Sequence, residues 1–188
     1  MSPSKFVARA RRLLRRFHDD KRGVSAVEFA MLLPLMVTLY IGGVEVSSAI
    51  AVDRKVTLVA RTVGDLVAQS TSVNATDMTN ILNASSSVVL PYSSSLITVT
   101  VSRVDVDANG VAKVIWSKTK NGTVQSGTVT LPAALNTANT SVIWAQSQYL
   151  YTPAIGYVIT GPITLRDQIY MRPRLSDNVV CNPAPNGC

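Results

Sequence analysis

The sequence predicts an α+β fold: a long N-terminal helix, transmembrane and then amphipathic, followed by a small antiparallel β-sheet domain packed on its outer half. Three observations predict it. An apolar run follows a basic N-terminal arm, valines then recur at helical spacing, and the residues after about 95 alternate between apolar and polar side chains. With 188 residues the chain has room for one ordinary domain, or a small domain with appendages.

The positive charge is confined to the first residues. The formal net charge is +7, and residues 1–22 carry eight Lys and Arg against Asp19 and Asp20, a net of +6. The remainder contributes only +1, so the body offers no large cationic surface for nucleic acid. Binding of nucleic acid through an intact basic arm stays as a minor alternative.

The residue types argue against an enzyme. His18, in the basic arm, is the single histidine, which leaves the body without the partner that a Ser or Cys nucleophile requires. A zinc site would have two cysteines and no histidine to complete it, and no glycine-rich phosphate loop is present. We therefore expect no catalytic residue, no metal and no cofactor, and a protein that inserts, assembles or binds.

The apolar run predicts a membrane-spanning helix. Residues 29–44 are uncharged and mostly apolar. Residues 24–45 would form a helix of roughly 32 Å, close to the roughly 30 Å of bilayer hydrocarbon. The basic arm before it predicts, by the positive-inside rule, a cytoplasmic N-terminus and an extracytoplasmic chain after about residue 50. A buried core helix is the less favoured interpretation.

Glu28 lies one turn into this apolar segment, where an unpaired carboxylate is costly. It could stay hydrated near the headgroups. Alternatively, cleavage after Gly23 would give Val24 a new ammonium group and make Glu28 the fifth mature residue. Its carboxylate could then pair with the α-amine of a neighbouring subunit and set the stagger between packed helices, because such a pair is strong at low dielectric.

The stretch from Lys21 to Phe29 resembles a type IV prepilin processing site, in which a peptidase cuts after glycine and the mature chain has Glu at position five. The first 50 or so residues resemble the TadE-like family of pseudopilins. Near the C-terminus, residues 149–153, 161–165 and 170–174 also resemble this family. The N-terminal positions that fit its pattern are Gly23, Glu28, Phe29, Ala30, Pro34 and Glu45.

The resemblance implies a minor pseudopilin of a tight-adherence (Flp-type IVb) pilus or a related secretion system, with a pilin-like fold. Residues 1–23 would be a cytoplasmic leader removed by a prepilin peptidase. Residues 24–70 would be the helix, and residues 71–188 a periplasmic β-rich domain. The implied partners are the inner membrane, the peptidase, other pilins or pseudopilins and the assembly machinery. Glu28 and Phe29 would serve assembly, and Glu45 would be a second intramembrane or interface carboxylate.

Two alternatives stay open. A basic region, an apolar region and residues 49–51 also make an ordinary signal peptide with cleavage after Ala51, although Glu28 and Glu45 argue against it. A single-pass anchored or secreted binding domain with no role in pilus assembly is the second alternative.

Beyond the membrane the helix continues to about residue 69, with one apolar face. Residues 70–76 are expected to be a linker, and a short helix at about 77–86 would have Thr76 as its N-cap. The predicted apolar face consists of Val52, Val56, Val59, Val63 and Leu66.

Strands are expected at 97–106, 111–118, 141–151 and 163–172, with a further one near 127–131. The alternation of apolar residues shifts by one position at Ser102–Arg103, which predicts a β-bulge or a change of buried face there. Val114 and Trp116 are both expected to point inward. Trp116, Trp144, Tyr149 and Tyr151 could form a carbohydrate-binding surface, but packing in the core and sheet is favoured.

Cys181 and Cys188 lie at the end of the chain. In an oxidising compartment outside the cytoplasmic membrane, a disulfide between them is expected and would keep the tail from fraying. Two free thiols are the alternative.

Overall fold

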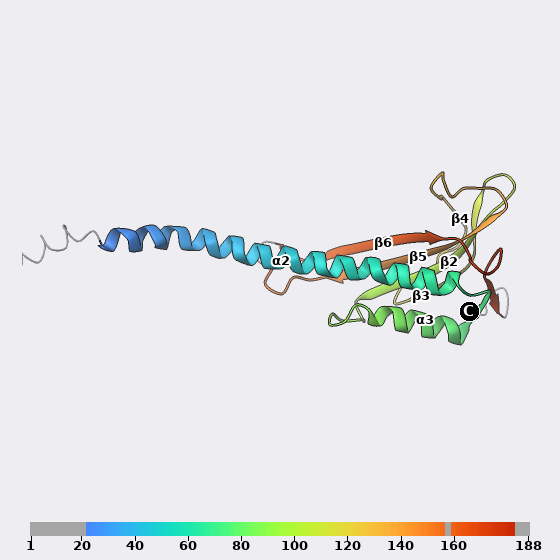
Figure 1. Ribbon diagram of the computed structural model, residues 1–188, viewed down its shortest axis with the longest axis horizontal. Coiled ribbons are helices and arrows are strands. Elements are labelled where there is room, and N and C mark those ends of the chain that lie inside the picture. The colour runs from blue at the N-terminus through green and yellow to red at the C-terminus, as the bar shows by residue number, and fades with distance from the viewer. Residues whose placement is uncertain (1–21, 157–158, 183–188) are drawn as a thin grey trace, which may run out of the picture. The chain divides into compact units, whose positions relative to one another are not determined.

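The computed structural model describes residues 22–156 and 159–182 and confirms the α+β class (Figure 1). Helix α2 (Arg22–Ala68) is followed by β1 (Ser72–Asn74) and helix α3 (Ala75–Ser87). The later strands are β2 (Ile97–Val106), β3 (Ala112–Lys120), β4 (Thr128–Val129), β5 (Thr140–Tyr151), β6 (Ile163–Met171) and β7 (Val180–Asn182). The chain divides into two compact units between Val44 and Glu45, and each is described by itself.

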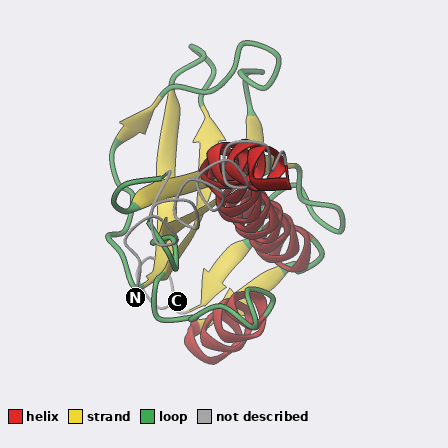
Figure 2. Ribbon diagram, turned by 90° about the vertical axis from the view of Figure 1, so that its left-hand side faces the viewer, coloured by secondary structure: helices red, strands yellow, loops and turns green. Residues whose placement is uncertain are grey.

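The second unit is built on a five-stranded sheet in the order β4-β3-β2-β5-β6, with antiparallel neighbours. The second half of α2 lies against one face of this sheet (Figure 2). Ser147 in β5 donates a hydrogen bond of 2.7 Å from its hydroxyl to the carbonyl of Val56 in α2. A Cβ at Gly64 would lie 3.3 Å from both the Ala145 Cβ and the Met171 sulfur, so glycine permits the close approach of helix and sheet.

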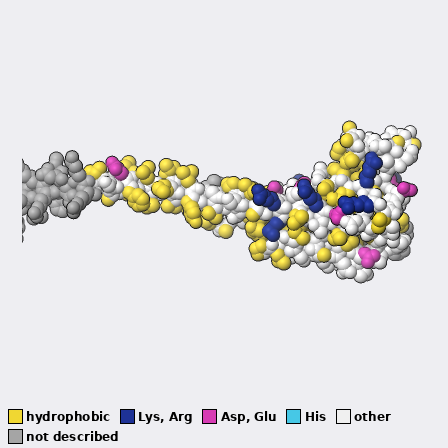
Figure 3. Space-filling view, in the orientation of Figure 1, with side chains coloured by type: hydrophobic (Ala, Val, Ile, Leu, Met, Phe, Trp, Pro, Cys, Tyr) yellow, Lys and Arg dark blue, Asp and Glu magenta, His cyan; other side chains and the backbone are white. Residues whose placement is uncertain are grey.

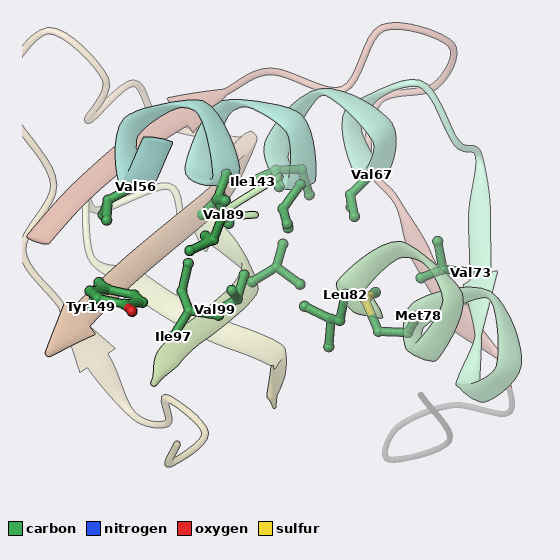
Figure 4. Packing of buried hydrophobic residues seen from close by; sticks show 14 of the residues in the cluster. Val56, Val67, Val73, Met78, Leu82, Val89, Ile97, Val99, Ile143 and Tyr149 are labelled. Carbon is green, nitrogen blue, oxygen red and sulfur yellow. The ribbon is translucent and has the colours of Figure 1, made fainter. Parts of the chain in front are cut away.

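The predicted apolar face of α2 is largely confirmed. Val52, Val56, Val59 and Val63 are fully buried and pack against β2 and β5 (Figure 4). Leu66 is 39% exposed, so its place in the face was wrong, and Val67 is buried instead. On an ideal helix, residues seven positions apart differ in direction by about 20°. Leu66 lies two heptads after Val52 and has therefore turned away from the sheet.

The predicted change of face in β2 is also confirmed. Register between β2 and β3 shifts between Arg103 and Val104, which pair with Trp116 and Val114. The extra residue, Ile115, is 45% exposed. Because the bulge changes the parity of β3, Val114 and Trp116 lie in different clusters, and the prediction that both point inward was wrong. A second apolar cluster thus forms on the face opposite α2, from Val104, Val106, Ala112, Val114, Leu131 and Val142.

Helix α3 begins two residues earlier than the sequence predicted. Its N-cap is Asn74 and not Thr76. The Asn74 Oδ1 accepts from the backbone N–H of Asp77 at 2.9 Å, and the Asp77 carboxylate accepts from the Asn74 N–H at 3.3 Å. This capping box satisfies two backbone donors, and Met78 and Leu82 then extend the core (Figure 4).

Strands β1 and β7 form a two-stranded parallel sheet in which Val73 is paired with Cys181. Neither strand was expected from the sequence, which predicts a linker at residues 70–76 and a last strand at 163–172. The indole N–H of Trp116 donates to the carbonyl of Val179 at 3.0 Å. The C-terminal segment is thereby fastened to the sheet.

Candidate functional site

The first unit presents an apolar helical surface, from Gly23 to Val44, that its own chain does not bury. In the part of the chain that the structure describes, α2 is the one helix long and apolar enough to cross a membrane. The visible face of its beginning is mostly hydrophobic (Figure 3). Lipid or other helices commonly cover a helical surface this apolar. Its exposed large side chains are Val24, Val27, Phe29, Met31, Leu32, Leu33, Leu35, Met36, Val37, Leu39, Tyr40 and Val44.

Pro34 lies inside α2 without ending it. Proline removes one backbone hydrogen bond from a helix. Four residues later, the Thr38 hydroxyl donates to the Pro34 carbonyl at 2.8 Å. Such bonds from a hydroxyl to the backbone one turn earlier satisfy the polar side chain within its own helix, as an apolar environment requires.

Glu28 is exposed on this apolar surface, and Phe29 beside it is 59% exposed. Neither side chain contributes to the core of the second unit. The structure therefore leaves the Glu28 carboxylate accessible to a group outside the chain.

Gly23 is not required by the packing of the fold. A Cβ at this position would meet no atom within 4 Å. Glycine inside a helix costs about 1 kcal/mol relative to alanine, so its presence has no explanation in the helix itself. The leader predicted at residues 1–23 lies, apart from its last two residues, outside the described residues.

Glu45 occupies a different environment from Glu28. Its side chain is buried, with 3% of its surface exposed, and its Oε2 accepts a hydrogen bond of 3.0 Å from the backbone N–H of Ile159. Burying a carboxylate is costly unless it is hydrogen-bonded. Within this chain Glu45 thus holds the segment between β5 and β6 against α2.

Cys181 is buried in β7, with 4% of its surface exposed. Cys188 lies outside the described residues, so the disulfide between them stays a prediction. No cluster of three or more potential metal ligands is found among the residues that the structure describes.

The aromatic residues divide between the two faces of the sheet. Trp116, Tyr149 and Tyr151 are buried in the core, as the sequence analysis favoured, and burial raises the pKa of Tyr149. On the opposite face the Trp144 and Tyr170 rings stack with centroids 5.9 Å apart and an interplanar angle of 11°. Burial raises the pKa of Tyr170 as well.

A polar groove of about 710 Å³ lies on the sheet face opposite α2 and was not expected from the sequence. Its lining comes from β2, β5, β6 and the loop after β3. The alternating polar residues of each strand were visible in the sequence. The register that places them side by side was not.

The structure defines a class of protein: an apolar N-terminal helix suited to a single membrane crossing, continued into an α+β domain. Within this class, the family model described as TadE-like protein matches residues 23–65. The resemblance predicted from the sequence is confirmed over this segment, which contains Gly23, Glu28, Pro34 and Glu45. No curated protein and no solved structure matches the chain.

Proposed function

We propose that this chain is a minor pseudopilin of a tight-adherence (Flp-type) pilus or a related secretion system, and a substrate of an enzyme rather than an enzyme. The match of residues 23–65 to the TadE-like model supports a role connected with this pilus. The observation that carries the finer proposal is Glu28, exposed on an apolar helix at the fifth position after Gly23. The chain would insert in the inner membrane with its N-terminus in the cytoplasm and its β-rich domain in the periplasm.

Processing is the first step of the proposal. A prepilin peptidase would cut between Gly23 and Val24 and remove the basic arm. Because a Cβ at position 23 would meet no atom within 4 Å, we expect Gly23→Leu to be tolerated by the helix. A failure of this variant to be processed would then report recognition by the peptidase, and not damage to the fold. Processing of Gly23→Leu at the normal rate would contradict the proposed cleavage site.

Assembly is the second step. After cleavage, the Glu28 carboxylate of one subunit would pair with the α-amine of Val24 in its neighbour. An ion pair within an apolar layer is strong, and loss of one partner leaves a costly buried charge. The pair would fix the axial stagger between helices and favour incorporation of the processed chain.

The test uses Glu28→Gln in a strain that lacks the wild-type copy, with Asp53→Asn as the matched control. Asp53 is an exposed carboxylate on the same helix, outside the apolar segment. We expect both variants to be cleaved normally, pilus number to fall with Glu28→Gln, and pilus number to be unchanged with Asp53→Asn. Normal pilus numbers with Glu28→Gln would refute the stagger role and favour an anchored binding domain.

A further inference from the structure

The polar groove on the sheet face opposite α2 has no part in the proposed assembly. Its volume of about 710 Å³ lies within the range of known ligand sites. Two cross-strand rows form its floor. One row contains Thr100, Gln146 and Gln168, and the next contains Thr98, Gln148 and Arg166.

The loop after β3 forms a wall of the groove and is fastened in place. The Thr98 hydroxyl donates to the carbonyl of Asn121 at 3.0 Å, and the backbone N–H of Gln125 donates to the Ser117 hydroxyl at 3.0 Å. Gly122 lies against the floor, where a Cβ would come within 2.4 Å of the Thr98 Cγ2. The wall is therefore held close to the floor by hydrogen bonds, and at Gly122 a larger residue would force Thr98 to shift.

One polar atom of the floor lacks a partner. The Gln146 Oε1 is buried and makes no hydrogen bond. Its neighbours are satisfied, since the Thr100 and Thr119 hydroxyls bond to each other at 2.8 Å and the Trp144 Nε1 donates to the Gln168 Oε1 at 3.1 Å. A buried acceptor without a partner destabilises the folded state. A donor entering the groove would remove this cost.

The residues that line the groove indicate which class of ligand would supply that donor. Hydroxyl and amide groups dominate, and among the described residues of the lining the single cation and anion, Arg166 and Asp167, offset each other. A phosphate or nucleic acid would require a cluster of cations, and a bound peptide usually fills apolar pockets with alternate side chains. The described residues that line the groove provide neither feature. Amides and hydroxyls both donate and accept, which matches a ligand whose own groups are neutral hydroxyls.

The next cross-strand row adds an aromatic surface. The stacked Trp144 and Tyr170 are partly exposed and lie one row from Gln146 and Gln168. Aromatic side chains combine an apolar body with a polar tip. They can therefore pack against the C–H face of a sugar ring while amides bond its hydroxyls.

We propose that this groove binds a neutral saccharide, with the Gln146 Oε1 accepting a hydrogen bond from a sugar hydroxyl. The inference concerns the second unit alone and does not depend on processing or assembly of the first. The ligand class is a neutral, polyhydroxylated chain of a few sugar units.

The test measures binding of malto-, cello- and chitohexaose to the full chain by isothermal titration and saturation-transfer NMR. A zwitterionic detergent is used, because glycosidic detergents would occupy the site. We expect at least one hexasaccharide to bind at millimolar concentration or below and to shift the Trp144 fluorescence. Failure of all three to bind at millimolar concentration would overturn the proposal, as would binding of an extended polar peptide in their place.

Gln146→Leu is the decisive variant, and Gln69→Leu is its matched control at the exposed position directly after the end of α2. We expect Gln146→Leu to weaken binding at least tenfold while the melting temperature stays the same or rises, because an unsatisfied buried oxygen is removed. Gln69→Leu should leave binding unchanged. If Gln146→Leu does not fold, Gln148→Leu in the adjacent row takes its place. Unchanged affinity in the folded groove variant would overturn the proposal.

Discussion

Two adjacent helix residues give opposite expectations for stability. Val67 is fully buried against the sheet, whereas Leu66 is 39% exposed. Val67→Ala removes two carbon groups from the core, which costs about 1.6 kcal/mol at about 0.8 kcal/mol each. The cavity left behind raises the total to about 2–3 kcal/mol. Leu66→Ala removes three carbon groups, but because they are partly in solvent we expect about 1 kcal/mol or less.

The assay is thermal unfolding of the full chain in detergent, followed by tryptophan fluorescence, since Trp116 lies in the same cluster as Val67. At about 2–4 °C per kcal/mol for a chain of this size, Val67→Ala should lower the melting temperature by roughly 5–10 °C and Leu66→Ala by less than about 4 °C. An equal or reversed order would refute the packing of this helix face on the sheet.

Three further predictions concern the N-cap of α3, the hydrogen bond of Glu45 and the burial of two tyrosines. Asn74→Ala should lower the free energy of unfolding, measured by chemical denaturation, by about 1 kcal/mol through loss of the N-cap, while Thr76→Ala should have little effect. An equal loss of stability in the two variants would argue against the capping box. Glu45→Leu should cost about 1 kcal/mol by leaving the part-buried backbone N–H of Ile159 without this acceptor. Glu45→Gln should cost less, because its amide oxygen still accepts, and equal melting temperatures of the two variants would contradict this. Burial raises the pKa of Tyr149 and Tyr170, so the folded chain keeps these protons at a pH where the unfolded chain releases them, and stability should fall as pH rises above about 10. Tyr170→Phe should make the loss of stability with rising pH less steep. A titration followed by tyrosinate absorbance, in which no tyrosine of the folded chain ionises later than in the unfolded chain, would contradict the prediction.

The features that local sequence determines were predicted well. The helix and most of its valine face follow from a repeat of three and four residues, which needs no knowledge of the partner surface. The change of face in β2 was visible as a switch in apolar parity at Ser102–Arg103. The prediction for Leu66 was wrong because positions seven residues apart move gradually around an ideal helix, so that after two heptads Leu66 no longer faces the sheet.

The missed features depend on pairing between distant segments. Strands β1 and β7 have three residues each and come from positions 72 and 180, so neither carries a periodic signal of its own. The bulge at Ile115 belongs to β3, yet its effect on Val114 and Trp116 appears only once the register with β2 is known. The groove likewise needs the register of three strands and the position of a loop.

The candidate assembly site shows the same division. Gly23, Glu28 and Phe29 could be selected from the sequence because they belong to a longer local pattern, which also includes Pro34 and Glu45. The family model covers this pattern at residues 23–65. The environment of Glu45 could not be predicted, because its partner, the Ile159 N–H, lies 114 residues further along the chain. Both glutamates were expected in or beside the apolar segment, and the structure distinguishes an exposed Glu28 from a buried Glu45.

The central claim is tested most directly by the N-terminus of the mature chain. The measurement is the intact mass of protein from washed membranes of cells that carry the pilus machinery, before and after reduction. We predict a chain that begins at Val24 and gains two hydrogens on reduction of the Cys181–Cys188 disulfide. A chain that begins at Val52, or one that keeps the basic arm, would contradict prepilin-type processing and the assembly role of Glu28.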